Sequence, residues 1–138
     1  MVVKHFTKIL WVCGLITMLP ILLFFIPWTV FSLTGIDVGK QLGVPFIKHW
    51  GLMAFCFGGL LVYAAMHPEV RRPVVIFAGV EKLGLCVIIA MGWSETFMAP
   101  LHATLFVDGA MVILFGLYLL SGGEPERRRE ASQFSRLH

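Results

Sequence analysis

The feature that most limits how this chain can fold is a long run without charge, from Ile9 to Ile36. A helix that crosses a bilayer core of about 30 Å needs about 20 predominantly apolar residues, so this run is long enough to span a membrane. Three further apolar runs follow, at 50–66, 74–93 and 97–120. None of them alternates apolar and polar residues over about ten positions, as the strands of a membrane barrel do. The four runs therefore predict membrane-spanning helices.

Composition excludes the other broad classes. Of the 138 residues, 58% are hydrophobic and 14% are charged, and the mean hydropathy is +0.85. Soluble domains carry about 25% charged residues, and so much apolar surface also excludes a disordered chain. We predict an all-α fold, an integral membrane four-helix transmembrane bundle over residues 1–121, with residues 122–138 as a charged, flexible cytoplasmic tail. The helices are expected near 6–31, 47–67, 73–93 and 99–121.

Two prolines interrupt the first predicted helix. Pro20 lies inside it and Pro27 lies near its end. Proline lacks a backbone N–H and its ring clashes with the preceding turn of a helix. We therefore expect the first helix to kink or to end early at one of these positions.

Lysine and arginine predict the orientation of the helices. The side of a membrane protein that is richer in these residues faces the cytoplasm, which places both termini inside, in a multi-pass protein of the cell inner (cytoplasmic) membrane. Three tryptophans, Trp28, Trp50 and Trp93, then fall at the outer interface, where indole rings concentrate. The net charge of +3 is explained by topology and by anionic lipid headgroups, so no nucleic-acid partner is expected. The basic residues on the inner side are Lys4, Lys8, Arg71, Arg72, Arg127, Arg128, Arg129 and Arg136, and those on the outer side are Lys40 and Lys48.

Three ionisable residues lie within the predicted spans: Glu81, Lys82 and Asp108. A charge at bilayer depth is costly and marks a functional site by default. Lys82 and Asp108 lie at similar depths on antiparallel neighbouring helices, as the rise of about 1.5 Å per residue shows, so we predict an ion pair between them. Adjacent residues on a helix do not share a direction. Glu81 therefore reaches this charge cluster from the other flank, is kept protonated by desolvation, or lines a polar cavity.

A second group of polar residues is expected on the outer side. His49 begins the second helix, His102 begins the fourth, and Glu95 lies in the same layer. Two imidazoles and a carboxylate suit a metal ion, and two imidazoles suit a haem iron. Interfacial histidines are common, however, so no cofactor is expected, with haem or quinone as the alternative. The chain has no phosphate-binding loop, nucleophile elbow or zinc-protease motif, and no catalytic residue is assigned.

The cysteines and the small residues point to helix packing. Cys13, Cys56 and Cys86 form no Cys-x-x-Cys pair, which favours buried apolar residues over disulfide exchange. Small residues recur at seven-residue spacing and allow helix backbones to approach closely. They predict packing within the bundle, with a homodimer or a larger membrane complex as the alternative. The recurring pairs are Gly51 with Gly58, Gly109 with Gly116, and Ala103 with Ala110.

Several stretches carry a family resemblance. Residues 49–53, 62–65 and 78–82, together with Asp108 and 112–120, resemble a family of small, uncharacterised four-span bacterial membrane proteins. In size and topology the chain is also loosely similar to the DoxX-like group of four-helix membrane proteins, some of which are linked to thiol or quinone redox chemistry. The resemblance implies a bundle in the bacterial inner membrane and assigns no activity.

Three functions are compatible with these observations. The first is a non-catalytic accessory or assembly subunit, whose buried Glu, Lys and Asp cluster serves packing. The second is a proton-coupled small-molecule transporter that acts as a dimer through Glu81. The third is a redox subunit that holds haem or quinone at His49 and His102. An enzyme is the less favoured interpretation, and the lipid bilayer is the one partner that all three share.

Overall fold

A computed structural model describes residues 2–34 and 43–121 of this chain, and this part is built from helices and short connections. Four helical segments are long and apolar enough to cross a membrane: His5–Phe25, Gly43–Met66, Pro68–Met91 and Met98–Leu120. The all-α fold class and the four spans are therefore confirmed. The predicted tail at 122–138 and the predicted outer residue Lys40 lie outside the described residues.

The first span differs from its prediction. The single helix expected near 6–31 is interrupted at both prolines, and the membrane span ends at Phe25. Pro20 lies in a short 3₁₀ turn, and Ile26 leaves the helical region with φ −129° and ψ 52°, as a residue before proline often does. The elements are α1 (Val2–Met18), η1 (Leu19–Ile21), α2 (Leu22–Phe25), α3 (Pro27–Thr34), α4 (Gly43–Met66), η2 (Pro68–Val70), α5 (Arg71–Met91), η3 (Thr96–Leu101) and α6 (His102–Leu120).

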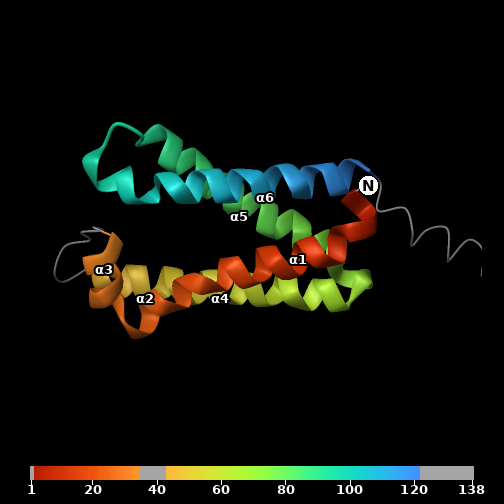
Figure 1. Cartoon of the computed structure of the whole chain (residues 1–138), viewed down its shortest axis with the longest axis horizontal. Coiled ribbons are helices and arrows are strands. Elements are labelled where there is room, and N and C mark those ends of the chain that lie inside the picture. Colours follow the sequence, from red (N-terminus) through yellow and green to blue (C-terminus); the bar gives the residue numbers. More distant parts are fainter. Residues whose placement is uncertain (1, 35–42, 122–138) are drawn as a thin grey trace, which may run out of the picture.

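The helices form two arms, each an antiparallel pair. In Figure 1, α1 runs along α4 in one arm, and α5 runs beside α6 in the other. Glycine explains the close approach within the first arm. A Cβ atom built on Gly58 would lie 2.6 Å from the carbonyl oxygen of Gly14, and one built on Gly51 would collide with the carbonyl oxygen of Pro20. These positions therefore need glycine.

The seven-residue spacing of small residues has two different outcomes. Gly51 and Gly58 pack inside the first arm, as predicted for contacts within the bundle. Gly109 and Gly116 on α6 do not, because a Cβ atom built on either would meet no other atom within 4 Å. The seven-residue spacing of glycines therefore predicts close packing of helices correctly in the first arm and not in the second.

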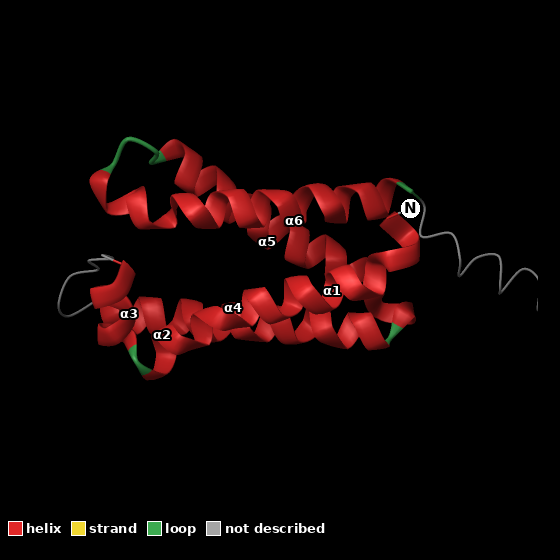
Figure 2. Ribbon diagram, viewed as in Figure 1, coloured by secondary structure: helices red, strands yellow, loops and turns green. Residues whose placement is uncertain are grey.

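The two arms meet at one end of the bundle, which we call the closed end. It carries the beginning of α1, the turn between α4 and α5, and the end of α6, on the right in Figures 1 and 2. The buried core lies here and includes Phe6, Leu10, Leu61 and Phe115. The ring of Phe6 also stacks on that of Tyr118 with their centroids 3.7 Å apart.

Arg71 fastens the turn at the closed end. Its guanidinium donates hydrogen bonds of 2.8–2.9 Å to the carbonyl oxygens of Ala64 and Ala65, at the end of α4, and to the hydroxyl of Thr7 on α1. The last carbonyls of a helix have no partner within the helix. Arg71 therefore satisfies two of these groups and ties the first arm to the beginning of α5.

The opposite end, which we call the open end, carries α2, α3 and the segment between α5 and α6 (Figure 2). The three tryptophans predicted to lie at one interface are all on elements near this end. Trp28 belongs to α3, Trp50 lies in the first half of α4, and Trp93 follows α5. The side chains of Trp28 and Trp93 are exposed.

Candidate functional site

A cavity of about 370 Å³ lies between the two arms, in the half of the bundle nearer the open end. All four spans contribute to its wall. The first arm supplies Leu23, Trp50 and Ala54, and the second arm supplies Leu85 and Leu101. Most of the lining is apolar, and the polar groups gather where the two arms approach each other.

We call that part of the lining the charged floor, formed by Glu81, Lys82 and Asp108. Lys82 comes from α5 and Asp108 from α6, and the Lys82 Nζ atom lies 2.7 Å from Asp108 Oδ1. This is the interhelical ion pair that the helix depths predict. The two side chains are only 4% and 9% exposed. Removal of one partner would leave an uncompensated buried charge, which is strongly destabilising.

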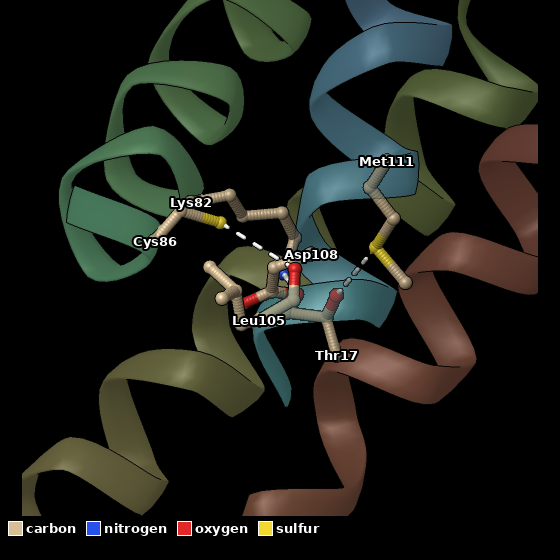
Figure 3. Close-up of polar contacts among 6 residues, drawn as sticks. All are labelled: Thr17, Lys82, Cys86, Leu105, Asp108 and Met111. Atoms are coloured by element: carbon tan, nitrogen blue, oxygen red, sulfur yellow. Dashed lines mark hydrogen bonds and ion pairs between the residues drawn. The ribbon is translucent and has the colours of Figure 1, made fainter. Parts of the chain in front are cut away.

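Helix α1 covers the ion pair from the other arm. Figure 3 shows Thr17 of α1 and Met111 of α6 close to Asp108, and the Thr17 hydroxyl donates to the Met111 sulfur at 3.8 Å. On the other side, the Cys86 thiol lies 3.8 Å from the carbonyl oxygen of Leu105. The pair is thus flanked by weakly polar groups on these two sides, and Glu81 is the one other charged side chain among the described residues that line the cavity.

Glu81 differs from its two neighbours. It is half-buried, it lines the cavity, and its Oε2 atom is buried without a hydrogen-bond partner among the described residues. The structure places Glu81 in the lining of a cavity, which is one of the three alternatives predicted for it, and the other two stay predictions. A buried polar atom without a partner is rare in proteins, so Glu81 is the part of the charged floor that packing does not explain.

The structure does not assemble the outer histidines into a metal site. His102 stacks on Trp93, with ring centroids 3.8 Å apart and an interplanar angle of 10°, and its Nε2 atom has no partner in the described part of the chain. His49 and Glu95 are exposed. Across residues 2–34 and 43–121, no three His, Cys, Asp or Glu side chains lie together in a way that could hold a metal ion.

The sequence suggests a cavity only as one alternative for Glu81, and it does not identify two further polar residues of the lining, Thr17 and Thr104. Thr104 precedes Asp108 by four residues, so the two share one face of α6, and that spacing could have identified it. Thr17 is a polar residue in a long uncharged run. The sequence predicts Trp50 at the membrane interface, and the structure shows that this residue also lines the cavity.

Comparison with protein-family models, with curated proteins and with solved structures finds no match to this chain. Its function is therefore inferred from the cavity and the charged floor.

Proposed function

We propose that this membrane protein binds a small amphiphilic molecule in the cavity between its two arms. The apolar part of the ligand packs against the lining of the arms, and its polar group meets the charged floor. The observation that carries the proposal is a cavity of about 370 Å³ that is largely apolar and has Glu81, Lys82 and Asp108 at one place in its wall. Ligand sites in proteins have this character, with volumes of about 300–1,000 Å³ and a few converging polar groups.

The assembly interpretation explains only part of the site. An ion pair between Lys82 and Asp108 can hold α5 and α6 in register, as expected of an accessory subunit. Such a role requires neither the neighbouring cavity nor a Glu81 oxygen that has no partner among the described residues. Ligand binding accounts for both, and it is compatible with a non-catalytic protein.

The orientation of the site follows from the basic residues. Lys8, Arg71 and Arg72 lie on elements of the closed end, and Lys48 lies near the open end. By the positive-inside rule the closed end faces the cytoplasm, and the ligand enters from the outer side of the inner membrane.

Transport is a second candidate, which the asymmetry of the bundle favours. The cavity lies toward one end, and a packed core that includes Leu10, Leu61 and Phe115 fills the other. A transporter in a conformation whose binding site is accessible from one side of the membrane has this arrangement. In this case the Glu81 carboxylate couples the movement of protons to the movement of the transported molecule. Glu81→Gln must then abolish the proton-driven flux of that molecule into proteoliposomes. Unchanged flux would reject Glu81 as the coupling carboxylate, and absence of flux in the unaltered protein would reject transport and leave binding intact.

Fluorescence quenching of Trp50 tests the binding proposal. In a variant with Trp11, Trp28 and Trp93 replaced by phenylalanine, Trp50 is the one tryptophan left, and it lines the cavity. Titration with 4-bromobenzyl alcohol, in nanodiscs of phosphatidylcholine, should quench it in a saturable manner, because bromine quenches an indole that it contacts.

A second variant supplies the control. With Trp28 as the one tryptophan, the reporter is 60% exposed on α3, so probe dissolved in the lipid should quench it without saturation. Saturation in the Trp50 protein alone supports the cavity as the binding site. Linear quenching of both proteins would contradict the proposal.

A further inference from the structure

We infer that the cavity selects a cationic amphiphile, a molecule with an apolar body and one positive charge, and that Glu81 is the counter-ion of that charge. The inference rests on the proposed function and adds the chemical class of the ligand. It follows from the charges that line the cavity and from the way in which two of them are already paired.

The charged floor has more negative than positive groups. The cavity is lined by two carboxylates, Glu81 and Asp108, and by one ammonium, Lys82. The other lining residues are uncharged. With all three groups ionised, the lining carries one surplus negative charge in an environment of low dielectric constant. A positive ligand completes the charge balance, whereas a negative ligand worsens it.

The geometry assigns the surplus to Glu81. Lys82 and Asp108 are both buried and lie 2.7 Å apart, so each already neutralises the other. Glu81 is less buried and keeps one carboxylate oxygen, Oε2, without a partner among the described residues. An anion that approached Lys82 would have to displace Asp108 and would then lie beside two carboxylates. A cation that approaches Glu81 Oε2 displaces no hydrogen-bond partner of this atom among the described residues.

The opposite wall fits the same class of ligand. Trp50 lines the cavity from α4, on the arm that faces Glu81 of α5. The face of an indole ring attracts ammonium groups, and it attracts quaternary ammonium in particular. Thr17 and Thr104 add hydroxyl groups to the lining and no charge. A carboxylate on one arm and an indole on the other are the two side-chain types that hold an alkylammonium head.

Three probes that share a 4-bromophenyl group and carry a positive, a neutral and a negative head group test the inference. They are (4-bromobenzyl)trimethylammonium, 4-bromobenzyl alcohol and 4-bromobenzenesulfonate, each titrated into the Trp50 protein in phosphatidylcholine nanodiscs. The cation should bind about tenfold more tightly than the sulfonate, as expected for one partly buried charge pair. The alcohol should lie between them.

The variants identify the counter-ion. Glu81→Gln should weaken binding of the cation about tenfold and leave the alcohol unchanged. Glu95→Gln, which removes an exposed carboxylate outside the cavity lining, is the matched control and should change neither. Asp108→Asn brings the charge of the lining to zero by a second route, so it must also reduce the preference for the cation. The comparison of the three probes on the Trp50 protein with Glu81 in place needs no further substitution, so it keeps the test decisive where a charge variant folds poorly.

The outcomes separate the two proposals. Saturable quenching by the alcohol, with no preference for the cation or with a preference that Glu81→Gln leaves intact, would overturn the inference and leave the proposed function standing. Absence of saturable quenching by all three probes would overturn the proposed function itself.

Discussion

At the scale of single residues, the molecule separates two kinds of buried charge. Lys82 and Asp108 satisfy each other, whereas Glu81, next to Lys82 in sequence, faces the cavity. The pair could be predicted from the sequence because the rise of a helix is constant, so depth follows from counting residues. The place of Glu81 could not, because its direction depends on how each helix is rotated within the bundle.

We predict that removal of one ion-pair partner destabilises the protein and that removal of both charges largely restores it. Lys82→Met should lower the free energy of unfolding by about 3 kcal/mol, since Asp108 is left buried without its partner. Unfolding in mixed detergent micelles measures this change. Asp108→Asn should cost less than Lys82→Met, because Glu81 remains as a carboxylate for the ammonium. Equal losses in Lys82→Met and in the double variant Lys82→Met with Asp108→Asn would show that the pair contributes nothing by its charges.

At the scale of elements, the first arm shows where sequence patterns are informative and where they are not. The two prolines correctly indicated that the first helix is interrupted, but the residue where the span ends depends on the backbone at Ile26. Glycine spacing indicated close packing in both arms and was right for Gly58 but not for Gly116. A glycine is needed only where another backbone lies against it, and that requires knowledge of the partner helix.

Two adjacent glycines on α4 test the packing of the first arm. Gly58→Ala would place a Cβ atom 2.6 Å from the carbonyl oxygen of Gly14, so we expect it to force α1 and α4 apart and to cost about 1–3 kcal/mol. Gly59→Ala is the matched control, because its Cβ atom would meet no other atom within 4 Å. Thermal unfolding in detergent compares the two proteins. A Gly58→Ala protein as stable as the Gly59→Ala protein would be inconsistent with direct backbone contact between the helices.

At the scale of the whole molecule, the arms join at one end and separate toward the other. The fold class and the four spans could be predicted because a bilayer requires long apolar helices. The cavity could not, because it depends on the angle between the arms and on side chains from all four spans. Thr17 and Trp50, for example, are 33 positions apart in sequence and line the same space.

The orientation of the molecule is tested by reporter fusions. We predict that alkaline phosphatase fused after Ser94, at the open end, is active, because this enzyme folds only outside the cytoplasm. The same enzyme fused after Glu69, in the turn at the closed end, should be inactive. Green fluorescent protein fused after Glu69 should fluoresce. The opposite pattern would show that the cavity is directed toward the cytoplasm.

The proposed function requires that a ligand occupies the cavity between the arms. Two alanines on α6 offer a direct test, because both are exposed and only Ala103 lines the cavity, whereas Ala110 does not. Ala103→Phe fills part of the space, and Ala110→Phe adds the same side chain outside it. We expect Ala103→Phe to abolish saturable quenching of Trp50 by 4-bromobenzyl alcohol and Ala110→Phe to leave it unchanged. Equal quenching curves for the two variants would show that the alcohol does not bind in this cavity.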